Sequence, residues 1–313
     1  MSILDKRIIV VTGKGGVGKS TVCAALGLFL AQQGRRTIIA ETAGCTAIPP
    51  IFGGKARGYK PIPMRPRLHT MSITPEAAIE DYVVQQLHIQ ALYKLVFRNR
   101  VMGPFIEAVP GLHDAIQLGK VFDLERQKDD AKHTWDTIIV DAPATGHGLT
   151  MLDAPRAMME LTRAGPVYEG VKMVHNVLDD PDTTAVVLVT LPEVMPLRET
   201  IEFYERLGQG RDKVALCILN QVLPDPIFNQ DEWDISKSAL ENHDHPGIAE
   251  GVQLVETWLH KVTQQMEAAT TISEQLPVPC VQLTHQAHNS EDKPPIDTLA
   301  NELGAALANG VAP

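Results

Sequence analysis

A glycine-rich stretch near the N-terminus constrains the fold of this chain more than any other part of its sequence. Residues 12–21 read TGKGGVGKST, which contains the pattern G-x-x-x-x-G-K-[ST]. An apolar run, residues 7–11, precedes the stretch, and a helical pattern over residues 22–31 follows it. A strand, a glycine-rich turn and a helix in this order predict a phosphate-binding loop that opens a βαβ unit.

The residue types in this loop suit the binding of a nucleoside triphosphate. Glycines lack Cβ atoms, so several backbone N–H groups can turn toward one anion that approaches closely. Lys19 would place positive charge near the β- and γ-phosphates, and the Ser20 hydroxyl would bind Mg²⁺. The positive end of the following helix faces the same anion. The expected nucleotide-binding residues of the loop are Gly13, Lys14, Gly15, Gly16, Val17, Gly18, Lys19, Ser20 and Thr21.

A second polar position follows a later apolar run. Residues 136–141 read DTIIVD, and Asp141 stands at the end of this expected strand. Mg²⁺ is a hard cation that takes oxygen ligands, so an aspartate at this place can hold it through its waters. The alternative for Asp141 is a capping role at the strand end. The small residues 142–148 that follow are expected to form a loop that moves between nucleotide states.

The order of elements predicts one α/β domain over residues 1–313. Apolar runs at residues 36–41, 184–190, 213–220 and 278–283, with helical patterns between them, indicate a mostly parallel central sheet with helices on both faces. Helical insertions are expected around residues 74–132 and 231–270. In the first, a helix after Gly111 would bury Leu112, Ala115, Ile116 and Gly119, and residues 120–132 would be solvated. Residues 52–67 are expected to be irregular.

Composition limits the class of protein and its partners. The 313 residues are 44% hydrophobic and 21% charged, as in a globular protein. A formal net charge of −10 disfavours a broad surface for nucleic acid or acidic lipid. The four cysteines are widely spaced and indicate reduced thiols, and no apolar run reaches membrane-spanning length. We therefore expect a cytoplasmic protein that neither spans a membrane nor binds nucleic acid.

Three stretches together resemble the ArsA/Get3 family of P-loop ATPases. Lys14 adds a second lysine to the loop, as in the deviant P-loop of the class that also includes the MinD/ParA proteins. Residues 141–149, DAPATGHGL, resemble the switch II segment of the ArsA/Get3 family. Residues 191–193, LPE, with Glu199 downstream, and residues 219–221, LNQ, are similar to stretches at that family's nucleotide site. The resemblance extends over about residues 7–283.

The resemblance implies roles for residues and partners. Two subunits, in a homodimer or a heterodimer with a paralogue, would sandwich ATP and Mg²⁺ between them, and Lys14 would reach the partner's phosphates. Asn220 would contact adenine, and Glu193 would lie near the partner's nucleotide. The alternatives are a loop charge for Lys14, a strand-end cap for Asn220 and a surface acid for Glu193. A protein cargo or partner is also implied, without indication of its identity.

One departure from the family pattern bears on catalysis. The family's switch I usually carries an aspartate that positions the attacking water, whereas this chain has Ala43 at the nearest matching place. A methyl group cannot orient water, and Glu41 is the nearest carboxylate that could replace the aspartate. Two hypotheses follow: a dimeric Mg-ATPase whose switch loops drive partner or cargo binding, with Lys14, Lys19 and Glu41 as catalytic residues, or a hydrolysis-poor nucleotide-binding regulatory or assembly subunit paired with an active paralogue.

Overall fold

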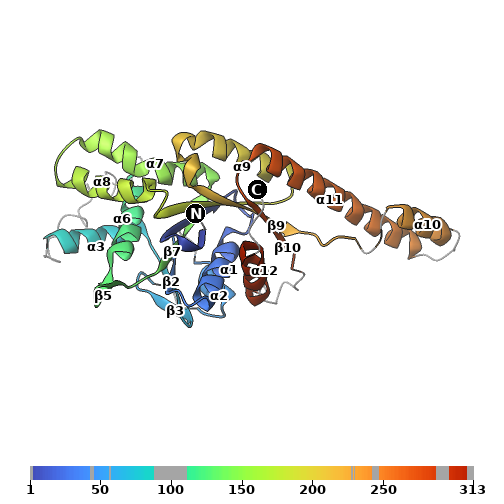
Figure 1. Ribbon diagram of the computed structural model, residues 1–313, viewed down its shortest axis with the longest axis horizontal. Helices are drawn as coiled ribbons and strands as arrows, with labels where there is room; N and C mark the ends of the chain where they lie inside the picture. The colour runs from blue at the N-terminus through green and yellow to red at the C-terminus, as the bar shows by residue number, and fades with distance from the viewer. Residues whose placement is uncertain are drawn as a thin grey trace.

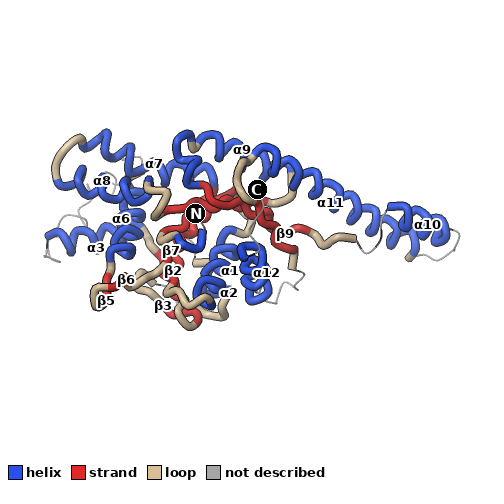
Figure 2. Tube along the Cα trace, viewed as in Figure 1, coloured by secondary structure: helices blue, strands red, loops and turns tan. Residues whose placement is uncertain are grey.

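An eight-stranded sheet forms the centre of the molecule (Figures 1 and 2). The structure is a computed structural model and describes residues 3–42, 46–55, 58–87, 111–226, 228, 230–241, 247–286 and 296–308. The strand order is β10-β9-β8-β1-β7-β2-β4-β3, and every neighbouring pair is parallel except β3 with β4. The strands are β1 Ile8–Gly13, β2 Thr37–Glu41, β3 Ile62–Arg65, β4 Leu68–Ser72, β7 Thr137–Ala144, β8 Thr184–Thr190, β9 Val214–Val222 and β10 Cys280–Thr284. The predicted mostly parallel α/β fold is therefore confirmed.

Helices cover both faces of the sheet, because alternate residues of each central strand point to opposite sides. In β1, Ile9 and Val11 belong to the core cluster on one face, and Ile8 and Val10 belong to the cluster on the other. The first face is covered by α1 Lys19–Gln32, α2 Ile48–Ile51 and α12 Ile296–Ala308. The second face is covered by α6 Leu112–Arg126, α7 Thr145–Thr162, α8 Pro166–Asp179, α9 Val194–Arg206 and α11 Ile248–Gln275.

The helices extend the molecule along one axis (Figure 1). At one end lie α7, α8 and α3 (Pro75–Leu87), and at the other end α10 (Gln230–Glu241) packs beside the first turns of α11. Thus α3 and α6 lie in the expected insertion around 74–132, and α10 and α11 in the one around 231–270. Small elements complete the description: η1 Ile3–Asp5, η2 Gly208–Lys213, β5 Lys128–Asp129 and β6 Lys132–His133.

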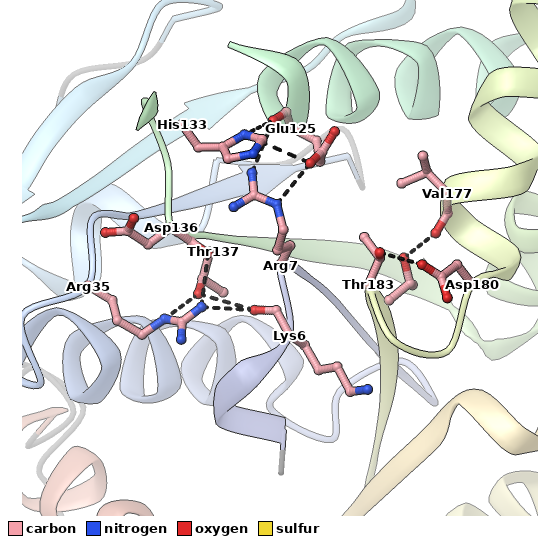
Figure 3. Close-up of polar contacts among 11 residues, drawn as sticks. Lys6, Arg7, Arg35, Glu125, His133, Asp136, Thr137, Val177, Asp180 and Thr183 are labelled. Atoms are coloured by element: carbon pink, nitrogen blue, oxygen red, sulfur yellow. Dashed lines mark hydrogen bonds and ion pairs between the residues drawn. The ribbon is translucent and has the colours of Figure 1, made fainter. Parts of the chain in front are cut away.

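A polar network closes the edge of the sheet at which β1 and β7 begin (Figure 3). The guanidinium group of Arg35, just after α1, donates to Thr137 Oγ1 at 2.8 Å. It also donates to the carbonyl oxygens of Lys6 at 3.1 Å and Asp136 at 2.9 Å. Nearby, Arg7 Nε donates to Glu125 Oε1 at 2.8 Å, which ties β1 to the end of α6. The opposite edge, where the parallel strands end, is left for ligands.

Two segments of the second quarter of the chain differ from the expectations. Residues 62–65 form an antiparallel edge strand on β4 instead of irregular structure, and the half-buried Ile62 and Met64 alternate with exposed neighbours. In α6 the expected face is only partly buried, and the buried residues are Gln117, Leu118, Val121 and Leu124. The helix continues to Arg126, so part of the segment expected to be solvated packs against the sheet.

Residues 142–148 do not form the loop that the sequence predicted. Strand β7 continues to Ala144, which pairs with Gly13 after an irregularity in the register, and α7 begins at Thr145. The Thr12 hydroxyl donates to the Pro143 carbonyl oxygen at 3.3 Å, which holds this segment against β1. The change from strand to helix is therefore direct, and helices α7 and α8 were not predicted.

Candidate nucleotide site

The phosphate loop is residues 14–18, between the end of β1 and the start of α1. Gly16 has φ 87° and Gly18 has φ 90°, a left-handed conformation that side chains disfavour. A Cβ atom on Gly13 would lie 2.1 Å from the carbonyl oxygen of Val189, so the loop starts in close contact with β8. Glycine is thus required by conformation at two positions of the loop and by contact at Gly13, the residue just before it.

Asn220 supports this loop from the end of β9. Its Nδ2 donates to the Val17 carbonyl oxygen at 2.8 Å, and its side chain is buried. A Cβ atom on Gly18 would approach Asn220 Nδ2 to 2.4 Å. The resemblance implied an adenine contact for Asn220, whereas the structure uses its amide nitrogen to hold the loop backbone. This second role has no signature in the sequence, because Asn220 and Val17 are far apart along the chain.

Lys19 and Ser20 are the first residues of α1 and lie over the loop. Lys19 Nζ donates to the Lys14 carbonyl oxygen at 3.0 Å, which directs the ammonium group back across the loop. Ser20 Oγ donates to Asp141 Oδ2 at 2.6 Å. The structure therefore brings together Lys19, Ser20 and Asp141 at the helix N-terminus, where the partial positive charge of the helix favours anions.

Asp141 has the environment expected of a cation ligand. It is a residue of β7 that is only 2% exposed, and its Oδ1 has no hydrogen-bond partner among the described residues. Burial raises the pKa of the Asp141 carboxyl, while the hydrogen bond from Ser20, the charge of Lys19 and the neighbouring Cys23 thiol oppose the rise. A buried carboxylate oxygen without a partner, next to a serine hydroxyl, fits a hard cation such as Mg²⁺.

Glu41 does not point toward the loop. Its Oε1 accepts hydrogen bonds from the backbone N–H groups of Ala47 at 2.6 Å and Ile48 at 2.9 Å. Its Oε2 accepts from the Thr70 hydroxyl at 3.3 Å. Glu41 is therefore the capping acid of the short helix α2, and its use as a replacement for the missing switch I aspartate receives no support. Ala43 lies outside the described residues.

Lys14 and Glu193 lie on the side of the loop next to α9. Lys14 Nζ forms an ion pair with Glu199 Oε1 at 2.7 Å, and both side chains are about one-third exposed. Glu193 is exposed immediately before α9, and the two apolar side chains that follow it, Val194 and Met195, are also exposed. The second lysine of the loop is thus paired with an acid of the same chain.

A buried glutamine that the sequence did not indicate holds the end of β2. Gln117 Nε2, on α6, donates to the carbonyl oxygens of Thr42 at 3.0 Å and Ile73 at 2.6 Å. Thr42 in turn donates from its hydroxyl to the Asp141 carbonyl oxygen at 2.9 Å. Helix α6 is therefore connected through Thr42, at the end of β2, to β7, the strand that carries Asp141. The only signal in the sequence was a lone polar residue between apolar ones.

Comparisons with known proteins agree with the fold and the loop. The family described as "Anion-transporting ATPase" matches residues 6–165 and 161–244. "ATPase BagA" of Mycobacterium tuberculosis is 32% identical over 256 residues, which are 79% of this chain and 73% of that protein. "ATPase GET3" of Lachancea thermotolerans is 25% identical over 275 residues, which are 74% of this chain and 79% of that protein. "Putative arsenical pump-driving ATPase 1" of Aquifex aeolicus is 26% identical over 72% of this chain and 65% of that protein.

The parallel sheet and its glycine-rich loop define an α/β protein of the P-loop class. Within this class, the chain belongs to the anion-transporting ATPase (ArsA) family, as the three sequence stretches predicted. Among the helices that the structure describes, none has an apolar length sufficient to cross a membrane.

Proposed function

We propose that this protein binds Mg·ATP at the phosphate loop and hydrolyses it as a dimer, with its nucleotide state driving contacts to a protein partner or cargo. The observation that carries the proposal is the Ser20–Asp141 pair beneath the loop, with one buried carboxylate oxygen left without a partner among the described residues. Membership of an ATPase family supports the same reaction.

The chain's own residues divide the work of phosphoryl transfer. The backbone N–H groups of residues 14–18 and the start of α1 bind phosphate oxygens, and Lys19 supplies positive charge beside them. Ser20 and Asp141 would hold Mg²⁺. When bound, Mg²⁺ neutralises charge on the β- and γ-phosphate oxygens. Asn220 keeps the loop in its binding conformation through the Val17 carbonyl group.

Lys14 is proposed to act across the dimer interface, as the family resemblance implies. The ion pair with Glu199 keeps the Lys14 ammonium group in its own subunit, so this contact must open before Lys14 reaches a partner's phosphates. An ion pair with this exposure contributes at most about 1 kcal/mol, which a triphosphate can outcompete. Glu199 would then weaken, but not prevent, the contact of Lys14 with the partner's phosphates.

A second candidate function rests on Ala43, which stands where the family's water-positioning aspartate is usual. The chain would bind nucleotide and regulate or assemble with an active paralogue while hydrolysing little itself. Because Glu41 is engaged at α2, the described residues offer no evident substitute at that position. The cytoplasmic location expected from the sequence is part of either proposal.

The two functions are separated by measuring binding and turnover on the same preparation. Calorimetry should detect Mg·ATP binding in either case, and its failure would refute both. Steady-state turnover that rises in specific rate with protein concentration, and that falls at least about tenfold in Lys14→Ala, is expected of the dimeric ATPase. Binding without turnover, with turnover appearing in Ala43→Asp, would favour the regulatory function.

Glu199→Gln tests the proposed restraint on Lys14. Removing the charge of Glu199 should lower the protein concentration at which ATP turnover is half-maximal by up to about fivefold, the equivalent of about 1 kcal/mol. Glu202→Gln, on the same helix and exposed, is the matched control and should leave it unchanged. Equal behaviour of the two variants would contradict the restraint without bearing on nucleotide binding.

A further inference from the structure

Two of the chain's cysteines face each other on the last two strands of the sheet. Cys217 of β9 and Cys280 of β10 are direct partners in the parallel register. Both are free thiols, and both contribute to the core on the face covered by α9 and α11. Their side chains lie close enough for each thiol to influence the ionisation of the other. Sixty-two residues separate them in sequence (280 − 217 − 1), so the sheet alone creates this pair.

The two thiols differ in access and in acidity. Cys217 is fully buried, whereas Cys280 is partly exposed. The hydrogen bond from Cys217 lowers the pKa of Cys280, and the backbone N–H of Leu219 acts in the same direction. The same hydrogen bond, together with burial, raises the pKa of Cys217. A partly exposed thiol with a lowered pKa beside a protected thiol is the arrangement of a nucleophilic and a resolving cysteine.

Cys23 provides the contrast within the same molecule. It is fully buried on α1, and burial and the neighbouring Asp141 raise its pKa. It lies on a helix, and no other cysteine is among the groups that shift its pKa. Cys23 therefore has the environment of an unreactive core thiol, unlike the partly exposed Cys280.

We propose that Cys280 and Cys217 form a peroxide-reactive dithiol that closes to a reversible disulfide between β10 and β9. This site is independent of the nucleotide reaction, and none of the sequence motifs indicates it. Adjacent strands lie about 4.8 Å apart, which is within the Cα separation that disulfides span. Strand β10 is at the edge of the sheet and its register with β9 is irregular beyond Gln282, so it can adjust without disturbing a second neighbour.

The chemistry requires a hydroperoxide as the oxidant and proceeds in two steps. The Cys280 thiolate attacks one peroxide oxygen, the O–O bond breaks, and the products are Cys280 sulfenic acid and hydroxide or an alkoxide, which takes up a proton. The Cys217 sulfur then attacks the Cys280 sulfur, the S–O bond breaks, and the leaving oxygen departs as water with the Cys217 proton. Two thiols are oxidised and one peroxide is reduced, and a thiol reductant reverses the change.

The disulfide would join the edge strand to the strand that carries Asn220. Cys217 is three residues before Asn220, which donates to the loop carbonyl of Val17. On the other side, Thr284 at the end of β10 donates to Glu302 Oε1 of α12 from its backbone N–H at 2.9 Å. Oxidation would therefore fasten the edge of the sheet next to the nucleotide site and close a loop that includes α10 and α11.

Peptide mapping of the full-length protein tests the proposal directly. After treatment with hydrogen peroxide and alkylation of the remaining thiols, trypsin should release one linked species. It joins the peptide 214–237, which contains Cys217, to the peptide that begins at Val262 and contains Cys280. The protein should lose two hydrogen atoms in mass, and dithiothreitol should restore it. Absence of this linked species, or linkage of either cysteine to Cys23 or Cys45 instead, would overturn the proposal.

Single substitutions separate the two roles. Cys217→Ser should stop at the first step, so dimedone should label Cys280 and no linked species should form. Cys280→Ser should abolish both the labelling and the linkage of this pair, because the remaining thiol, Cys217, is buried. Dimedone labelling of Cys217 in Cys280→Ser would contradict the assignment of the nucleophile. The peptide map uses the wild-type protein, so it tests the proposal even if one of the variants fails to fold.

Discussion

Gly18 packs so closely against Asn220 that a side chain at position 18 would collide with it, so β9 helps to fix the conformation of the loop. Gly18→Ala would introduce a Cβ atom 2.4 Å from Asn220 Nδ2 at a residue with φ 90°. The left-handed strain alone costs about 1–2 kcal/mol, so ATP affinity measured by calorimetry should fall at least about fivefold.

Gly119→Ala is the matched control for this prediction. A Cβ atom there meets nothing within 4 Å, and the residue lies inside α6. Alanine should leave ATP affinity unchanged and raise stability by about 0.5–1 kcal/mol, because glycine is disfavoured in helices. Wild-type affinity in Gly18→Ala would mean that the loop binds phosphate in another conformation.

Asp141 gives the protein a pH dependence with a defined sign. Because burial raises the pKa of Asp141 above its unfolded value, the folded state holds this proton more tightly than the unfolded chain. The stability contributed by this group is greatest at low pH and is lost as the pH rises from about 4 through the raised pKa. Above that pKa, the ionised Asp141 carboxylate lowers the free energy of unfolding, as expected of a group that is kept to bind a metal.

Asp141→Asn should remove this dependence in protein free of Mg²⁺ and nucleotide. From about pH 4 to pH 7, the free energy of unfolding of wild type should decline relative to that of the variant, as urea titrations would measure. Glu41 also has a pKa raised by burial, and the charge of Asp141 adds to that rise, so removing the charge changes the pH dependence of the variant in the same direction. Asp129→Asn, at an exposed position, should keep the wild-type profile. A constant difference between wild type and Asp141→Asn would contradict the buried charge.

Among the elements, the two ends of the parallel strands have separate roles. The end of the sheet at which β1 and β7 begin is closed by the Arg35 network (Figure 3), and the end at which they finish carries the loop and Asp141. Stability and ligand binding should therefore respond to different substitutions.

Arg35→Met tests this separation. The variant leaves the Asp136 carbonyl group and the Thr137 hydroxyl without the guanidinium donor, and the Lys6 carbonyl group keeps the bond from Thr137 Oγ1 at 3.4 Å, so the free energy of unfolding should fall by about 2–3 kcal/mol. ATP affinity of the folded protein should remain within about twofold, the equivalent of about 0.4 kcal/mol. Arg206→Met, an exposed arginine on α9, should change stability by less than about 0.5 kcal/mol. A loss of ATP affinity in Arg35→Met equal to that in Gly18→Ala would show that the two ends are coupled.

Elements with a strong local signal could be predicted, and those defined by contacts could not. The apolar runs of β1, β2, β7, β8 and β9 and the glycine pattern before α1 are local, and the structure has these elements in those places. Leu112 and Ile116 of α6 follow a helical period equally well as Leu118 and Val121, so only packing decides which are buried. For the same reason the capping role of Glu41 and the support from Asn220 depend on contacts that the sequence does not display.

At the scale of the whole molecule, one buried side chain connects the long helix α11 to the nucleotide side of the sheet. Gln265 of α11 accepts a hydrogen bond from the Leu223 backbone N–H at 2.9 Å and donates to the Leu223 carbonyl oxygen at 2.8 Å. Leu223 follows β9 directly and lies three residues after Asn220. The helix that reaches the far end of the molecule is therefore fastened to the strand that supports the phosphate loop (Figure 1).

Gln265→Leu keeps the size of this side chain and removes both hydrogen bonds. The Leu223 backbone groups then lose their partners at a part-buried place, so the free energy of unfolding should fall by about 2–3 kcal/mol. ATP affinity should fall by about twofold to fivefold, since a looser end of β9 holds Asn220 less firmly, a change of about 0.4–1 kcal/mol. Urea titration and calorimetry measure the two effects. Gln264→Leu, the exposed neighbour on the same helix, should change neither by more than about 0.5 kcal/mol. If stability falls in Gln265→Leu while ATP affinity stays at the wild-type value, α11 is fastened to the sheet without influencing the loop.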